Sequence, residues 1–202
     1  MELVFQLAIL LMSVVIHEVS HGLAARHYGD RTAEYQGRLT LNPLKHLDPV
    51  GSIIVPIILF LTQSGVIFGW AKPVPYNPYN LKPGRWPEAA VAAAGPFSNF
   101  VIAVVFSVIL RFGIAQGFST PFIHITALIV SVNLLLMVFN LVPVPPLDGS
   151  RLLFALFPEN VYRLRNFFER YGFLLVIFFI LFVWQFVEPL VITLFSILTG
   201  VR

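Results

Sequence analysis

Long apolar runs, separated by polar stretches rich in proline, glycine and asparagine, set the pattern of this chain. A helix needs about 20 predominantly apolar residues to cross a bilayer. Four apolar runs reach that length, while a fifth, at residues 50–70, is interrupted by glycine, proline and polar side chains. The pattern predicts an all-α polytopic membrane protein with four to six transmembrane helices, in a single domain over residues 1–202. The predicted membrane segments are residues 3–25, 50–70, 89–110, 122–142 and 172–198.

Two proline-rich stretches, Gly37–Gly51 and Gly69–Pro87, flank the interrupted run. Proline lacks the backbone N–H that a helix interior needs, so helix is excluded over much of both stretches. We expect extended segments or a hairpin that re-enters the membrane beside the functional site. Backbone of that kind is tolerated at membrane depth only where protein or a water-filled cavity surrounds it.

Basic side chains are concentrated in three loops, and this distribution predicts the orientation of the chain. Loops rich in lysine and arginine stay on the cytoplasmic side of a membrane. Two of these loops flank residues 50–70, so a cytoplasmic location for both requires that segment to enter and leave on one side. A re-entrant hairpin is therefore favoured there, and a fifth full span is the alternative. The basic residues are Arg26, Arg31, Arg38 and Lys45, then Lys72, Lys82 and Arg85, and finally Arg151, Arg163, Arg165 and Arg170.

The composition excludes other classes of protein. Apolar residues make up 57% of the chain and charged residues 11%, whereas soluble domains carry about 25% charged residues. The net charge of +3 is carried mostly in the loops, which we interpret as orientation information rather than as a surface for nucleic acid. The chain contains no cysteine, so any metal ion must be held by histidine, aspartate or glutamate.

The strongest chemical motif is HEVSH, at residues 17–21 inside the first apolar segment. Side chains four residues apart on a helix meet, with Cβ atoms about 5–6 Å apart. His17 and His21 can therefore both reach one zinc ion at about 2.0–2.1 Å. Glu18 lies about 100° round the helix from His17, where it can act as general base on an activated water without binding the metal.

The position of this motif indicates a site inside the membrane. Ionisable side chains in a membrane helix are costly and usually functional, although on a soluble helix the same residues could form a solvated face. His17 lies roughly 21 Å along the helix axis from Leu3, and Arg26 lies roughly 13 Å further. We expect a site below the cytoplasmic surface that water reaches from that side.

A catalytic zinc ion normally has three protein ligands and one open position, so a third ligand is needed. Asp148 is the leading candidate, because the fourth apolar segment ends in NLVPVPPLDG, at residues 140–149, on the same side as His21. The alternative is that Asp148 only caps a helix before Gly149. Asn140 opens the same motif and could stabilise the developing oxyanion or bridge two helices. The other acidic residues, which fit less well, are Glu34, Asp48, Glu88 and Glu188.

Several other residues are expected to have structural roles. His27 and His46 fall in loops and are expected to be solvated, while His124 lies near a segment start at the membrane interface. The small-residue run from Ala89 to Gly95, followed by Pro96 and Asn99, favours close helix packing more than chemistry. In the last segment, Glu188–Pro189 predicts a kink or a break.

Three motifs together resemble the site-2 protease family of intramembrane zinc metalloproteases. They are HEVSHGLAA at residues 17–25, AAAGPFSN at 92–99 and NLVPVPPLDG at 140–149. The resemblance runs through most of the chain. It implies one zinc ion per chain, with His17, His21 and Asp148 as ligands. It also implies that Glu18 is the general base and that Asn140 helps to position the substrate.

The same resemblance predicts the reaction and its setting. It implies cleavage of membrane-anchored proteins within or near their transmembrane helix, with extended segments pairing with the unwound substrate; Gly37–Leu41 and Trp70–Tyr76 are the candidates. There is no room for a PDZ or CBS domain, so a minimal form of the family is expected. We therefore expect a multi-pass plasma-membrane zinc metalloendopeptidase whose active site opens toward the cytoplasm. The alternatives are a membrane metal-binding or zinc transport protein and an inactive protease-like scaffold.

Overall fold

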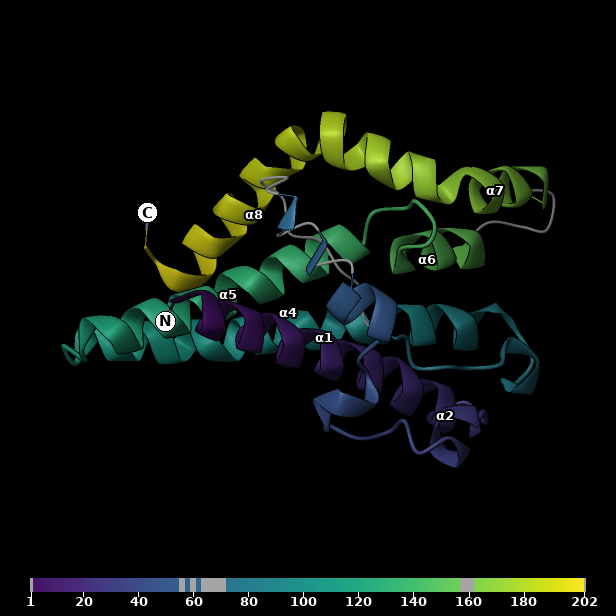
Figure 1. Cartoon of the computed structure of the whole chain (residues 1–202), viewed down its shortest axis with the longest axis horizontal. Helices are drawn as coiled ribbons and strands as arrows, with labels where there is room; N and C mark the ends of the chain where they lie inside the picture. Colours follow the sequence, from purple (N-terminus) through teal and green to yellow (C-terminus); the bar gives the residue numbers. More distant parts are fainter. Residues whose placement is uncertain (1, 55–56, 59–60, 63–71, 157–161, 202) are drawn as a thin grey trace.

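The computed structural model describes residues 2–54, 57–58, 61–62, 72–156 and 162–201, and every regular element within these ranges is a helix (Figure 1). This confirms the predicted all-α polytopic fold. The longer helices are α1 (Glu2–His27), α4 (Arg85–Ala115), α5 (Thr120–Asn140), α6 (Asp148–Leu156), α7 (Tyr162–Phe178) and α8 (Trp184–Thr199). The short elements are α2 (Thr32–Tyr35), the 3-10 turns η1 (Pro43–Lys45) and η3 (Pro78–Asn80), and the wide helical turns η2 (Pro49–Ile54) and η5 (Phe179–Val183).

Four helical stretches are long and apolar enough to cross a membrane, namely Val4–His27, Arg85–Ala115, Thr120–Asn140 and Arg170–Thr199. They coincide with four of the five predicted segments. The local sequence sets where these helices begin. Helix α5, for example, has a proline in its first turn, where the missing N–H would have no partner within the helix anyway.

The last predicted segment, residues 172–198, bends at a different place from the one expected. The sequence suggested an interruption at Glu188–Pro189, but α8 continues through Pro189. The helix widens instead at η5, and Figure 1 shows the helix axis changing direction between α7 and α8. A wide turn takes backbone groups out of the regular i→i−4 hydrogen-bond ladder, which is a recognised cause of helix bending.

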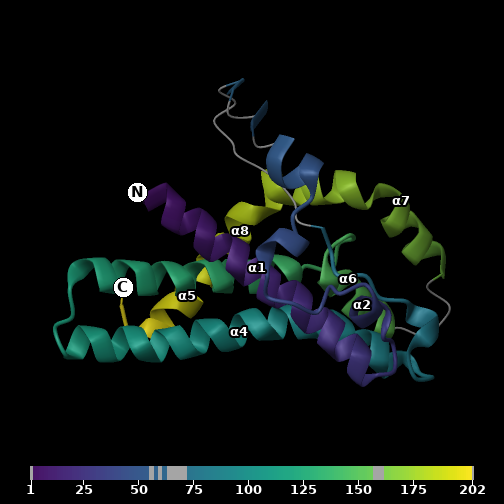
Figure 2. The ribbon, with the colours of Figure 1, turned by 60° about the horizontal axis from the view of Figure 1, so that its bottom comes forward.

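Helix α4 is the centre of the packing, because it contacts both α1 and α5 (Figure 2). Its buried face carries Ala89, Ala92 and Gly95, and residues this small allow a neighbouring helix to approach closely. Helix α4 therefore holds α1, with its HEVSH motif, against the rest of the bundle. An apolar core lies between α4, α5 and α8 and is built around Ala103, Val130 and Leu134.

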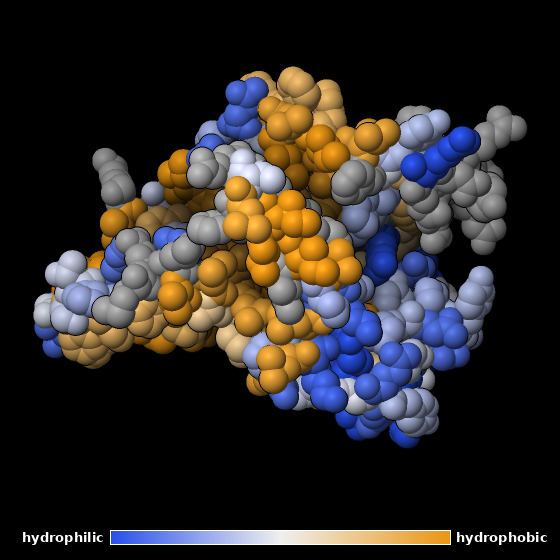
Figure 3. Space-filling view, viewed as in Figure 1, coloured by the Kyte–Doolittle hydropathy of each residue, from blue (hydrophilic) through white to orange (hydrophobic). Residues whose placement is uncertain are grey.

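Hydrophilic residues gather at one end of the molecule, where α2 and the end of α1 lie (Figure 3). The described parts of the two proline-rich stretches meet there. The backbone N–H of Lys72 donates to the carbonyl of His46 at 2.8 Å, but neither described part forms a strand. The predicted re-entrant hairpin or fifth span at residues 50–70 falls largely outside the described residues.

His46 is fully buried at this polar end, so the expectation that it is solvated was wrong. Its relative exposure is 0%, and its Nε2 atom lies 2.8 Å from the carbonyl oxygen of Thr40. A histidine in a polar loop becomes covered when two loops fold over one another. Which loops meet depends on the arrangement of the helices that carry them.

Candidate metal centre

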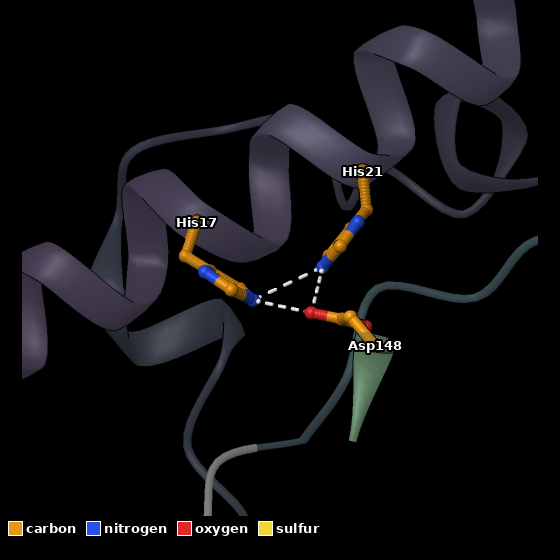
Figure 4. Close-up of side chains that lie close together, drawn as sticks. All are labelled: His17, His21 and Asp148. Atoms are coloured by element: carbon orange, nitrogen blue, oxygen red, sulfur yellow. Dashed lines mark hydrogen bonds and ion pairs between the residues drawn. The ribbon is translucent and has the colours of Figure 1, made fainter. Parts of the chain in front are cut away.

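The three predicted metal ligands meet at one point beside α1 (Figure 4). Nε2 of His17 lies 3.0 Å from Oδ2 of Asp148, and Nε2 of His21 lies 3.1 Å from the same oxygen. The two Nε2 atoms lie 3.0 Å apart. All three residues are buried, with relative exposures from 5% to 8%. The spacing of the histidines on α1 and the position of α6 therefore place three possible donor atoms together.

The arrangement of these donor atoms fits a zinc ion. Ligands about 2.0–2.1 Å from a tetrahedral zinc ion lie about 3.3 Å from one another. The separations of 3.0–3.1 Å in this cluster are close to that value. Histidine nitrogen and carboxylate oxygen are both common zinc donors, and three of them leave the fourth position open, as in catalytic zinc sites.

Hydrogen bonds to α4 orient both imidazole rings. Nδ1 of His21 lies 2.7 Å from the carbonyl oxygen of Val91, and because a carbonyl can only accept, this nitrogen carries the proton. Nδ1 of His17 lies 2.5 Å from Oδ1 of Asn99. Each ring thereby turns its Nε2 atom toward Asp148. A proton on Nδ1 leaves a lone pair on Nε2, which is what a metal ion requires.

Gly95 provides the space in front of these two nitrogens. It is buried on α4, between the residues that contact the two rings. A Cβ atom at this position would lie 2.5 Å from Nε2 of His17 and would also collide with Nε2 of His21. The space that a Cβ atom would fill in front of both Nε2 atoms is therefore open because residue 95 has no side chain. Its location, against both Nε2 atoms, suits a metal ion.

A tight turn places Asp148. The prolines of PVPP, at residues 143–146, prevent α5 from continuing, and α6 begins at Asp148. A Cβ atom at Gly149 would overlap the backbone carbonyl of Leu141, so only glycine allows α6 to fold back so closely against the end of α5. The carboxylate of Asp148 contacts the two histidines, which a helix-capping role alone does not explain.

Glu18 lies next to the first ligand on α1 and is partly buried. Its Oε2 atom accepts a hydrogen bond from the backbone N–H of Val74 at 2.8 Å. The close approach of that loop depends on Gly22, since a Cβ atom there would lie 2.8 Å from Cγ1 of Val74. Glu18 is thereby held by this loop and is not one of the three clustered residues.

The sequence reasoning missed the contact of Asn99 with the site. Asn99 belongs to a segment that was interpreted as packing, yet it is fully buried and contacts His17. An asparagine inside an apolar helix was the available signal, because such side chains usually find a polar partner. Asn140 ends α5, and its amide donates to the carbonyl of Leu136 at 2.9 Å. Among the described residues, the metal cluster does not include Glu34, Asp48, Glu88 or Glu188.

Comparisons with known proteins agree on a family. The sequence model of Peptidase family M50 matches residues 5–121 and 111–184. "Putative zinc metalloprotease YwhC" of Bacillus subtilis is 40% identical over 180 residues, covering 86% of this chain and 78% of that protein. "Putative zinc metalloprotease Rip2" of Mycolicibacterium smegmatis is 31% identical over 180 residues, covering 83% of this chain and 62% of that protein. "Zinc metalloprotease MJ0392" of Methanocaldococcus jannaschii is 27% identical over 158 residues, covering 78% and 36% respectively. No solved structure matches the chain.

Proposed function

This chain belongs to peptidase family M50 and is an integral membrane protein, and on that premise we propose that it is an intramembrane zinc metalloendopeptidase. Its proposed substrates are membrane-anchored proteins, which it cleaves within or near a transmembrane segment. The observation that carries this proposal is the convergence of the buried donor atoms of His17, His21 and Asp148, with Glu18 following His17 directly on α1. The proposed cofactor is one zinc ion per chain.

The chemistry follows from the residues around this cluster. Zinc held by His17, His21 and Asp148 would supply Lewis-acid activation of a water molecule and of the scissile carbonyl. Glu18 takes a proton from the attacking water and then delivers it to the leaving amine. Because Oε2 of Glu18 is engaged by a backbone N–H, Oε1 is the atom that we assign to proton transfer. Asn140 is proposed to help position the substrate, as the family resemblance implies.

The proposed substrate must change conformation before it is cleaved. A transmembrane helix holds its peptide carbonyls in the i→i−4 hydrogen-bond ladder, so local unwinding precedes attack. Residues 37–41 and 70–76 are the proposed pairing segments. The described part of the second segment includes Val74, which contacts Glu18 directly. A substrate strand paired with this segment would therefore pass close to the general base.

The proposed location is the plasma membrane, with the active site opening toward the cytoplasm. The polar end of the molecule contains the loops after α1 and before α4 (Figure 3). The loops carry Arg31, Lys72 and Lys82, while Arg26 lies in the last turn of α1 and Arg85 begins α4. Loops of this composition favour the cytoplasmic side of a membrane. The HEVSH motif lies toward the same end of α1, within reach of water from that side.

A cleavage assay on the purified protein tests the proposal. The protein is reconstituted in liposomes with a fluorescently tagged single-span membrane protein, and casein in detergent serves as an unfolded soluble substrate. We expect cleavage that a chelator abolishes and added zinc restores. Glu18→Gln should lower the rate by a factor of at least about 10² while zinc remains bound.

Two other outcomes would support different functions. Accumulation of zinc inside the liposomes without cleavage of either substrate would favour zinc transport. Tight zinc binding with neither cleavage nor transport would favour an inactive protease-like scaffold. Cleavage by Glu18→Gln at the normal rate would contradict the assigned mechanism, because the general base would then lie elsewhere.

A further inference from the structure

A chain of buried hydrogen bonds runs from His17 into helix α5. Oδ1 of Asn99 lies 2.5 Å from Nδ1 of His17, and Nδ2 of Asn99 donates to Oδ1 of Asn133 at 2.8 Å. Nδ2 of Asn133 donates to the backbone carbonyl of Ile129 at 2.9 Å and to Oγ of Ser13 at 3.0 Å. The relative exposure of both asparagines is 0%. These hydrogen bonds link His17 to α4 and α5 through the side-chain amides of Asn99 and Asn133, and we call these two amides the amide relay.

The direction of the hydrogen bonds in the amide relay is set at its far end. A backbone carbonyl has only lone pairs, so the group of Asn133 that faces Ile129 must be its NH2 group. The carbonyl oxygen of Asn133 therefore faces Asn99, and the NH2 group of Asn99 donates to it. Oδ1 of Asn99 is left facing His17, so Nδ1 of His17 is the protonated nitrogen. Reversing one amide would set two donors or two acceptors against each other.

We propose that Asn133, acting through Asn99, is a positioning residue that selects the Nδ1–H tautomer of His17 and so leaves Nε2 available as a metal ligand. This inference rests on the proposed zinc site. Hydrogen-bond partners of a metal-binding histidine fix its tautomer and ring orientation, and their loss typically weakens metal binding about 10–100-fold. His21 obtains the same orientation from a backbone carbonyl that cannot reverse. His17 faces a side-chain amide, which needs a second residue to hold its orientation.

Helix bridging is the competing explanation, because asparagines often join membrane helices. An asparagine that only bridges helices would stabilise the fold, and its effect on zinc would not depend on which atom faces His17. The two explanations differ in what aspartate at position 99 would do. A carboxylate can only accept, so it would hold the Nδ1–H tautomer of His17 without any help from residue 133.

Three variants separate these explanations. Asn133→Leu removes the anchor and lets the amide of Asn99 rotate. Asn133→Leu combined with Asn99→Asp supplies an obligate acceptor in its place. Thr126→Val is the control, because Thr126 is also a buried polar residue of α5 but donates to the carbonyl of Phe122 in its own helix at 2.8 Å. Zinc affinity is measured in detergent by competition with a chelator.

We expect Asn133→Leu to raise the zinc dissociation constant by about 10–100-fold. The double variant should recover most of that loss, and Thr126→Val should bind zinc as the wild type does. Unchanged zinc affinity in Asn133→Leu would overturn the proposal. So would a double variant no better than Asn133→Leu, because a packing or bridging role of Asn133 cannot be replaced by a carboxylate at position 99.

A second measurement reads the tautomer without any metal. Nitrogen-15 NMR of the zinc-free protein shows whether Nδ1 of His17 carries a proton, and this reading is separate from any proton shared between Nε2 and Asp148. We expect Nδ1 of His17 to be protonated in the wild type and in the double variant, and only partly protonated in Asn133→Leu. An unprotonated Nδ1 in the wild type would contradict the proposal.

These measurements also separate failure of this proposal from failure of the proposed function. If zinc affinity changes among the variants as expected but no substrate is cleaved, the role of the amide relay is supported and the protease function is contradicted. If Asn133→Leu cleaves normally and its zinc affinity is unchanged, the protease function is supported and the role of the amide relay is contradicted. If the protein binds no zinc, the tautomer of His17 still decides whether the amide relay acts on it.

Discussion

The backbone N–H of Val74 donates a hydrogen bond to Oε2 of Glu18 at 2.8 Å, so a loop rather than a side chain holds the proposed general base. Val74 is buried and lies in the sequence KPVP, in which the residue before each proline is restricted to extended backbone. The same loop is fixed further along, where the N–H of Asn77 donates to Asp30 at 2.7 Å. The orientation of Glu18 therefore depends on how residues 72–80 lie against α1.

Replacing Val74 by proline tests this dependence. The change removes the N–H while preserving an extended backbone between Pro73 and Pro75. A hydrogen bond to a charged group contributes about 1.5–3 kcal/mol, so we expect Val74→Pro to lower kcat on the tagged membrane substrate about tenfold or more, with zinc content unchanged. Val74→Ala keeps the N–H and should retain most of the activity. Equal losses in both variants would assign the effect to side-chain packing.

Gly95 is predicted to be essential for metal binding. The Cβ atom of Gly95→Ala would enter the space in front of His17 Nε2, so we expect the purified variant to contain little zinc. Its far-ultraviolet circular dichroism should match the wild type, because alanine favours helix more than glycine does. Gly113→Ala, on the same helix, is the control and should keep its zinc, since the added atom there meets Phe122 and Ile123. Full zinc occupancy in Gly95→Ala would refute the assigned position of the metal.

Removing the metal should lower the melting temperature of the protein. Three buried donor atoms that lie 3.0–3.1 Å apart need a cation or shared protons between them. A ligand that binds only the folded state stabilises it in proportion to the logarithm of its free concentration. We therefore expect the melting temperature in detergent to rise steadily with free zinc, and Asp148→Asn to abolish most of that rise. His124→Ala, which changes a histidine outside the cluster, should respond as the wild type does.

Asp30 should make the stability of the protein depend on pH. Burial alone would raise its pKa, but hydrogen bonds from Thr32, Asn80 and Asn77 outweigh that effect and lower the pKa of Asp30 below its ordinary value. The folded state therefore keeps Asp30 ionised at a pH where the unfolded chain takes up a proton. This contribution to stability is complete above about pH 4 and is lost as the pH falls through the lowered pKa.

The matching experiment compares the melting temperatures of the wild type and Asp30→Asn across a range of pH. Asparagine cannot accept all the hydrogen bonds that reach the carboxylate, so we expect the variant to be less stable by about 1–3 kcal/mol at neutral pH. The gap between the two proteins should narrow as the pH falls from about 4 through the lowered pKa of Asp30, where the folded wild-type carboxylate also becomes neutral. A gap that stays constant through this range would show that the charge of Asp30 contributes nothing.

The membrane helices and the core of the site could be predicted because each depends on spacing along the chain. A helix spans a bilayer when its apolar run is long enough, and His17 and His21 share a helix face because they are four residues apart. Asp148 could be predicted as the third ligand because the apolar segment before it is expected to end on the same side of the membrane as His21. Those rules use only the order and the chemical type of the residues.

The rest of the site depends on how separate helices are placed against one another. The contact of Asn99 with His17 and the bond from Val74 to Glu18 both join elements that are distant in sequence, and no periodicity encodes them. The bend at η5 lies in the apolar sequence FILFV, which contains neither proline nor glycine to mark it. Proline at position 189 was the stronger local signal, yet α8 continues through it.

Helix α4 contacts the two histidines of the candidate metal centre at points eight residues apart, through Val91 for His21 and through Asn99 for His17. These points are separated by about 12 Å along the helix axis, and a slide of α1 by one helical turn would displace both contacts by about 5.4 Å. Neither hydrogen bond survives such a displacement. The register between α1 and α4 is therefore locked while the metal site is intact. We therefore expect the movement that admits the proposed substrate helix to be made by other parts of the protein, so that access and chemistry would involve different moving elements.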